Sequence, residues 1–172
     1  TPTVIWTSDD GYAEWDWLAR EAQRRGLRLS FGVSESYVGV SGFLTATQVA
    51  DLQNKYGHEV TNHGGANDNY AEIGLTEYLR RVNSCRGYLI SLGIDPRSAN
   101  LHQYIQGIYD DALVSAMKSA GYLSARQTSS SFPVFPSAGV RIVGPTADPL
   151  YKVSTCASLG SCLLYTSPSP RD

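Results

Sequence analysis

Short apolar runs alternate with amphipathic segments along most of the chain, and this alternation constrains the fold more than any other feature. Strand-like runs are expected at residues 4–6, 27–33, 58–60, 99–104 and 122–125. Between them apolar residues recur at helical spacing, and the helical segments end at Gly26, Gly57, Gly93 and Gly121. This pattern predicts an α/β fold with βαβ units, a parallel sheet and right-handed crossovers. Two further strands are expected at residues 140–143 and 151–153.

The composition suits one globular domain. The chain has 172 residues, of which 42% are hydrophobic and 17% are charged. The net charge of -2 gives no basic surplus to neutralise phosphates, so we expect no nucleic-acid partner. No run of eighteen apolar residues occurs, so we expect no membrane span. We expect the protein to be a monomer.

Polar residues cluster just after the expected strands. Asp9 and Asp10 follow the first strand, His63 follows the third, Tyr104 ends the fourth and Arg126 follows the fifth. Because chemistry gathers at the carboxyl ends of strands in α/β folds, we expect these side chains to converge. Two carboxylates and a histidine suit a divalent metal such as Zn²⁺, with one Asp left as a base for a metal-bound water. The pattern alone, however, favours an Asp-Asp-Gly turn or helix N-cap.

The order of the motifs resembles that of the polysaccharide deacetylase family, the NodB homology domain of carbohydrate esterase family 4. The family opens with T-F-D-D-G, and this chain has TSDDG at residues 7–11. The second family motif is G-H-E-[IV]-x-x-H-x-x-x-H, and residues 57–67 read GHEVTNHGGAN. The family's Y-P-x-G and A-G-Y segments correspond to YIQG at residues 104–107 and AGY at residues 120–122. The resemblance runs from about residue 3 to residue 126.

The resemblance implies a fold, a reaction and roles for particular residues. The fold is a distorted, incomplete (β/α) barrel. The reaction is metal-dependent hydrolysis of N-acetyl or O-acetyl groups on a polysaccharide, which releases acetate and cleaves no peptide bond. Asp9 would be the base that activates water, and Asp10, His63 and Asn67 would hold Zn²⁺, Co²⁺ or Ni²⁺. Tyr104 would lie in the substrate groove, near a backbone N–H that stabilises the oxyanion. Such a substrate implies an extracellular or cell-surface protein.

The chain departs from the family pattern at several positions. Asn67 stands where the family has a second histidine ligand, and it is either a weaker ligand or an ordinary loop residue. Gln103 and Ile105 stand where many members have Arg and Pro. The family Arg pairs with the base carboxylate, so Arg126 either substitutes for it from the next strand or lies on a solvated rim. The family's last motif, Leu-x-His, supplies a general acid, but no histidine follows His102.

These departures leave a second function open. The alternative is a non-catalytic carbohydrate-binding relative that has kept the groove and lost the chemistry. The changes at Asn67, Gln103 and Ile105 favour it, whereas intact Asp9, Asp10 and His63 favour the enzyme. A glycoside hydrolase is disfavoured, because its two carboxylates must flank the bond at least ~5 Å apart.

The remaining histidines and cysteines have simpler interpretations. His58 and His102 lie in or beside strands and are expected to be core histidines. Cys85 lies on the apolar stripe of a helix and is expected to be buried. Neither a disulfide framework nor a zinc-type cysteine pair is expected.

The C-terminal segment is interpreted separately. Residues 162–172, CLLYTSPSPRD, resemble a translated transposase sequencing adaptor left in a metagenomic assembly. We therefore expect a deacetylase-like domain at residues 1–161, truncated at its C-terminal end, and a non-native tail at residues 162–172.

Overall fold

The computed structural model of the protein describes residues 6–66 and 68–126. In this part five strands form one sheet in the order β1-β2-β3-β4-β5, and every neighbouring pair is parallel. The strands are β1 (Thr7–Ser8), β2 (Ser30–Val33), β3 (Glu59–Asn62), β4 (Leu101–Gln103) and β5 (Ser124–Arg126). The predicted parallel sheet is therefore confirmed. The strands expected at residues 140–143 and 151–153 lie outside the described residues.

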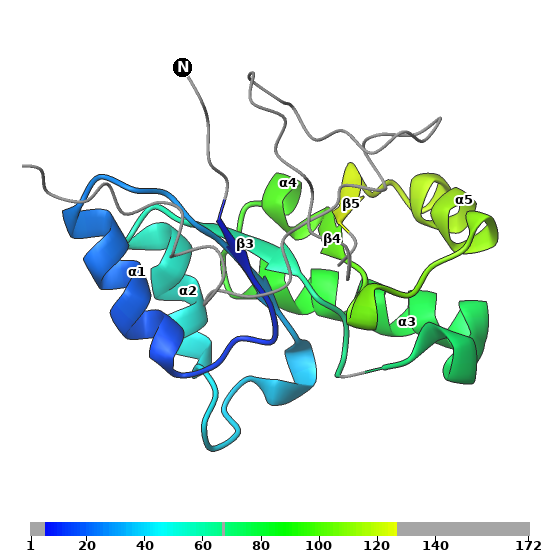
Figure 1. The fold of residues 1–172 in the computed structure, drawn as a ribbon, viewed down its shortest axis with the longest axis horizontal. Helices are drawn as coiled ribbons and strands as arrows, with labels where there is room; N and C mark the ends of the chain where they lie inside the picture. The colour runs from blue at the N-terminus through cyan, green and yellow to red at the C-terminus, as the bar shows by residue number, and fades with distance from the viewer. Residues whose placement is uncertain (1–5, 67, 127–172) are drawn as a thin grey trace, which may run out of the picture.

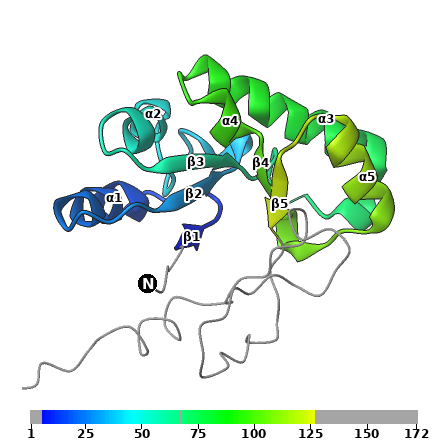
Figure 2. The same cartoon turned by 90° about the horizontal axis from the view of Figure 1, so that it is seen from above.

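The sheet curls into half of a barrel. Figure 1 shows the strands with their connecting helices, and Figure 2 shows that the helices lie along the outer, convex side. The helices are α1 (Glu14–Arg24), α2 (Ala46–Asn54), α3 (Tyr70–Ser91), α4 (Pro96–Ala99) and α5 (Asp111–Ser119). Two short 3₁₀ turns, η1 (Glu35–Tyr37) and η2 (Ile105–Gly107), follow β2 and β4. The expected incomplete (β/α) barrel is confirmed.

Local sequence signals explain where several helices begin. Thr45 and Gln48 form the expected capping box at the start of α2. Asp110 caps α5, because its side chain accepts a hydrogen bond from the N–H of Leu113 at 2.7 Å. Helix α3 begins earlier than its apolar stripe suggests, and its first turn is separated by a kink at Gly74, where φ is 75°.

The core lies between the sheet and the helices. Strand residues alternate between the two faces of a sheet. Phe31 and Val33 of β2 and Val60 of β3 face outward, and they pack with the apolar sides of α1, α2 and the C-terminal half of α3. A second cluster joins the first half of α3 to α5 and to the ends of β4 and β5. The alternate positions of the strands therefore face the concave side.

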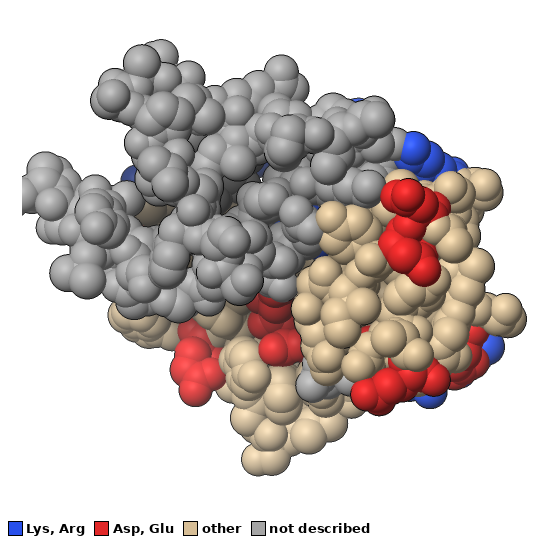
Figure 3. All heavy atoms as spheres, turned by 45° about the vertical axis from the view of Figure 1, so that its right-hand side comes forward, with Lys and Arg blue, Asp and Glu red and all other residues tan. Residues whose placement is uncertain are grey.

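The described helices and one face of the described surface can be compared with the features of membrane proteins and polyanion binders. None of the described helices is long and apolar enough to cross a membrane. On the face shown in Figure 3, the described surface carries more acidic than basic side chains. This distribution agrees with the small negative net charge of -2.

Candidate metal and active site

The carboxyl edge of the sheet brings together four of the polar residues singled out in the sequence. Asp9 and Asp10 follow β1, His63 follows β3 and Arg126 ends β5. Oδ1 of Asp10 lies 3.5 Å from Nε2 of His63. Asp9 forms an ion pair with Arg126. The two adjacent carboxylates therefore have different partners, and these come from different strands.

The backbone is strained at Asp10. Its φ is 76°, in the left-handed region that residues with a side chain seldom adopt, and Gly11 follows with φ of 89°. The loop is held in this shape because the carbonyl of Gly11 accepts a hydrogen bond from the N–H of Leu44 at 2.9 Å. Strained residues that the surrounding structure holds in place cluster at functional sites. With this backbone conformation the Asp10 side chain faces His63, while the Asp9 side chain faces Arg126.

The ring of His63 is held by the backbone of the next strand. Its Nδ1 lies 2.9 Å from the carbonyl oxygen of Gln103, and the side chain is only 6% exposed. A carbonyl oxygen can only accept, so Nδ1 carries the proton and donates it. In the neutral ring the lone pair then lies on Nε2, which faces Asp10. This arrangement, with the second nitrogen bonded to a backbone carbonyl, is typical of metal-ligating histidines.

Asp10 and His63 fit a shared metal ion. Two ligand atoms at the usual distances from a tetrahedral Zn²⁺ lie about 3.3 Å apart. The observed separation of 3.5 Å is close to this value. Two acceptor atoms facing each other at this distance require a cation or a proton between them. Within residues 6–66 and 68–126, however, no group of three His, Cys, Asp or Glu side chains is arranged to hold a metal.

The ion pair between Asp9 and Arg126 is partly shielded from water. The Arg126 side chain is 11% exposed and the Asp9 side chain is 27% exposed. Burial lowers the pKa of the Arg126 guanidinium, and the Asp9 carboxylate opposes this change. The pairing anticipated from the sequence is present, and Arg126 does not lie on a solvated rim. Its role in a reaction stays a prediction.

Two other predicted site residues have different outcomes. Asn67 lies outside the described residues, so its role as a ligand stays a prediction. Tyr104 is 1% exposed, and its N–H donates to the carbonyl of Arg126 at 2.9 Å. The next N–H, of Ile105, donates to the Tyr78 hydroxyl at 3.3 Å. The oxyanion role proposed near Tyr104 also stays a prediction.

Two residues that support His63 were missed in the sequence. Asn62 is fully buried, donates to the carbonyl of Val82 at 2.8 Å and accepts from the N–H of Gly64 at 2.8 Å. Ser34 donates to the carbonyl of His63 at 3.2 Å. The sequence did contain one signal for Asn62: a polar residue occupies a strand position whose neighbours on the same face are apolar and pack against the helices. Together these contacts fix the chain on both sides of the His63 ring.

The other histidines and the described cysteine serve the core, as expected. Nε2 of His58 lies 2.8 Å from the carbonyl of Ala19, and its Nδ1 accepts from the N–H of Leu29 at 3.3 Å. Nε2 of His102 lies 3.0 Å from the Tyr78 hydroxyl. Cys85 is buried, and this burial raises its thiol pKa to about 12.

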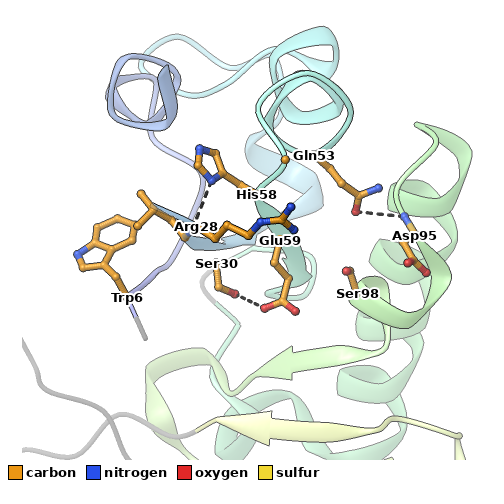
Figure 4. Close-up of a pocket in the computed structure, with 10 residues that line it drawn as sticks. Trp6, Arg28, Ser30, Gln53, His58, Glu59, Asp95 and Ser98 are labelled. Carbon is orange, nitrogen blue, oxygen red and sulfur yellow. Dashed lines mark hydrogen bonds between the residues drawn. The ribbon is translucent and has the colours of Figure 1, made fainter. Parts of the chain in front are cut away.

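A cavity of about 510 Å³ lies at the opposite, amino edge of the sheet. Figure 4 shows its lining, where Ser30 donates to Glu59 at 2.8 Å and Asp95 donates its N–H to Gln53 at 3.2 Å. In barrels of this kind the amino edge serves stability and the carboxyl edge serves chemistry. We therefore place the candidate active site at Asp9, Asp10 and His63 and not in this cavity.

No protein-family model matches the sequence, and no curated protein matches it. Solved structures do match. A polysaccharide deacetylase from Bacillus cereus has a TM-score of 0.68 at 17% identity, covering 88% of this chain and 46% of that protein. A Streptococcus pyogenes deacetylase in complex with acetate has a TM-score of 0.66 at 15% identity, covering 74% of this chain and 57% of that protein. A family 4 carbohydrate esterase from Streptomyces lividans, also in complex with acetate, has a TM-score of 0.59 at 20% identity, covering 73% and 62%.

These comparisons define the fold. The chain has the fold of the NodB-type polysaccharide deacetylases, as its motifs predicted. The matches cover 46% to 62% of the length of these proteins. The carboxyl edge of the sheet, where Asp9, Asp10 and His63 meet, is the place where α/β barrels carry their chemistry.

Proposed function

We propose that this chain is a metal-dependent carbohydrate deacetylase that removes N-acetyl or O-acetyl groups from a polysaccharide. One observation carries the proposal: Nε2 of His63 lies 3.5 Å from Oδ1 of Asp10, while Nδ1 lies 2.9 Å from a backbone carbonyl oxygen. The fold supports it, because two similar structures are described as deacetylases and a third as a family 4 carbohydrate esterase, and two of the three hold acetate, the product of such a reaction. A polysaccharide substrate would place the protein outside the cell or on its surface. We propose that it acts there as a monomer.

The residues of the site divide the chemistry between them. Asp10 and His63 would hold the metal, with Asn67 as a further ligand. A bound Zn²⁺, Co²⁺ or Ni²⁺ would lower the pKa of a water from ~15.7 towards ~7. Asp9 would accept the proton of that water, and Arg126 would orient the Asp9 carboxylate through their ion pair.

The overall reaction balances as a hydrolysis. The water oxygen joins the acetyl carbon, the bond from that carbon to nitrogen or oxygen breaks, and acetate leaves. The departing amine or hydroxyl takes up a proton. No histidine after His102 is present to supply this proton, so the Leu-x-His acid of the family has no counterpart in the sequence.

Metal stoichiometry and affinity test the proposal directly. The wild-type chain and the variants Asp10→Ala and His63→Ala are titrated with Zn²⁺, with Asp51→Ala on the exposed side of α2 as the matched control. We expect one Zn²⁺ per wild-type chain, weakened in the two site variants and unchanged in the control. If the folded wild-type chain binds no Zn²⁺ specifically, the proposal is rejected.

Product analysis distinguishes the enzyme from the binding relative. The metal-loaded chain is incubated with acetylated chitin oligomers and with acetylated xylan, and free acetate is measured. Acetate release that depends on Asp9 supports the deacetylase. Oligosaccharide binding without release of acetate favours the non-catalytic relative, and shortened glycans would indicate a glycoside hydrolase.

A further inference from the structure

Three aromatic rings form a stack beside the candidate site. The ring of Phe43 lies between those of Tyr12 and Tyr37, with centroid distances of 5.0 Å and 4.5 Å and interplanar angles of 21° and 23°. Tyr12 belongs to the loop after β1, and the other two rings belong to the segment between β2 and α2. We call these three rings the aromatic stack. Both connections leave the carboxyl edge of the sheet, so the stack lies on the same edge as Asp10.

The backbone fixes the stack relative to Asp10. Tyr12 and Phe43 form an isolated antiparallel bridge. On either side of it, the N–H of Ala13 donates to Gly42 at 2.9 Å and the N–H of Leu44 donates to Gly11 at 2.9 Å. These contacts join the two loops, and Tyr12 is two residues from Asp10 in the chain.

Part of the stack is exposed at the surface, at the end formed by Tyr12. Tyr12 is 44% exposed, and the nearby Val40 is 48% exposed. Tyr combines an apolar ring with a polar tip, and such side chains are enriched where one end of a contact is apolar and the other is wet. Pyranose rings offer the matching chemistry, because their axial C–H groups form an apolar face and their hydroxyls line the edge.

We propose that the aromatic stack is a sugar-binding subsite that receives a pyranose ring of the polysaccharide next to the ring held at Asp9, Asp10 and His63. The inference rests on the proposed carbohydrate substrate and adds where a neighbouring sugar binds. A neutral sugar fits better than an acidic one, because the carboxylates of Asp10 and Glu14 lie near the Tyr12 hydroxyl. A protein partner fits less well, since specific protein interfaces bury about 800 Å² on each side and this apolar surface consists of a few side chains.

The test is a binding titration that does not depend on turnover. Penta-N-acetylchitopentaose is titrated into the full chain in the presence of EDTA, with the N-acetylglucosamine monomer as the comparison ligand. The variants are Tyr12→Leu, which removes the aromatic face, and Tyr12→Phe, which keeps it. Trp17→Ala is the matched control, because Trp17 is 64% exposed on α1 and outside the stack.

We expect the pentasaccharide to bind more tightly than the monomer. Tyr12→Leu should raise its Kd by about 3- to 10-fold, the range expected when one aromatic stacking partner is lost. Tyr12→Phe should stay within about 2-fold of wild type, and Trp17→Ala should not change the Kd. If Tyr12→Leu does not fold, Tyr37→Leu tests the other end of the stack with the same expectation.

The outcomes separate this inference from the proposed function. Equal affinity in the wild type and Tyr12→Leu, or no binding of pentasaccharide by the wild type, would overturn the subsite even if acetate is released from small acetylated substrates. Weakened binding in Tyr12→Leu without any acetate release would keep the subsite and reject the deacetylase. A purely structural role for the stack would lower thermal stability in Tyr12→Leu and leave the Kd of the folded variant unchanged.

Discussion

Arg126 and Asp9 form an ion pair although their strands are the two edges of the described sheet. Three strands separate β1 from β5, so in a flat sheet of ~4.8 Å spacing the two side chains would lie too far apart to meet. They meet because the sheet curls, and the residues are 117 positions apart in sequence. The pair therefore joins the first and last described strands across the concave face and sets the geometry at the Asp9 carboxylate.

The first prediction concerns the energy of this contact. Arg126→Gln leaves a partly buried carboxylate without its partner, and we expect a loss of about 1–3 kcal/mol in the free energy of unfolding. Asp9→Asn should cost a similar amount, and the double variant should cost less than the sum of the two. Urea denaturation of the four proteins measures the coupling.

Additive effects of Asp9→Asn and Arg126→Gln would show that the ion pair contributes no stability. Arg97→Gln is the control, since Arg97 lies on the short helix α4 and has no place in this contact. Introducing Arg at position 103 tests the geometry further, because Gln103 is the register partner of Arg126. We expect Gln103→Arg to recover part of the stability lost in Arg126→Gln.

The second prediction concerns Asn62, which links β3 to α3 and shapes the turn after His63. Asn62→Leu removes a second donor to the Val82 carbonyl, which keeps its hydrogen bond within α3, and it removes the acceptor of the buried Gly64 N–H. We expect a loss of about 2–4 kcal/mol in unfolding free energy. Zn²⁺ affinity should fall by about 10- to 100-fold, because groups that orient a ligand have effects of this size.

Asn54→Ala is the matched control for Asn62→Leu, because Asn54 is exposed at the end of α2. It should change neither stability nor metal affinity appreciably. A folded Asn62→Leu protein that binds Zn²⁺ as tightly as the wild type would show that Asn62 does not position His63.

The third prediction concerns Gly32 on the concave face. A Cβ at this position would lie 1.6 Å from Oε1 of Gln103, so the glycine leaves room for that buried side chain. Gly32→Ala should therefore destabilise the protein by about 1–3 kcal/mol. Adding Gln103→Ala should remove most of the penalty. Thermal or urea unfolding of the single and double variants measures both effects.

Gly87 provides the control for Gly32→Ala. It lies within α3, and apart from the adjoining backbone of that helix nothing lies within 4 Å of a Cβ built there. Gly87→Ala should stabilise the helix by about 0.5–1 kcal/mol. A Gly32→Ala protein as stable as the wild type would mean that Gln103 moves aside without cost.

Much of the fold followed from local sequence signals. The capping box at Thr45 and Gln48 predicted the start of α2, because the contact involves only neighbouring residues. Of the first expected strand, at residues 4–6, the structure describes only Trp6, and the strand that it describes is Thr7–Ser8, which pairs with β2. Helix α4 was missed because it is one turn long, although Asp95 and Pro96 are typical of a helix start.

The sequence predicted which residues meet at the candidate site. It did not predict the hydrogen bonds that hold these residues in place. Asp10 and His63 follow strands, and the rule for carboxyl edges predicted that they would meet. The carbonyl of Gln103 that orients His63, and the backbone groups that Asn62 binds, depend on how strands and helices pack. No spacing in the sequence encodes these contacts.

The last prediction is a pH dependence that arises from His102. Burial lowers the pKa of this side chain from 6.5 to about 3, with a smaller contribution from His63. Between these two values the unfolded chain binds a proton that the folded protein does not. Stability should therefore be fully present above about pH 6.5 and fall as the pH decreases, by up to ~1.4 kcal/mol for each pH unit. The loss should level off near pH 3.

The dependence of the unfolding free energy on pH, compared between the wild type and a variant, separates the effect of His102 from that of the other titrating groups. Urea denaturation between pH 7 and pH 4 is compared for the wild type and His102→Gln, which cannot take up a proton in this range. The variant will itself be less stable, because Nε2 of His102 contacts the Tyr78 hydroxyl at 3.0 Å. Its unfolding free energy should nevertheless fall less steeply with decreasing pH, by close to one proton. Equal slopes in the two proteins would show that His102 is protonated in the folded state and that its burial does not control the acid stability.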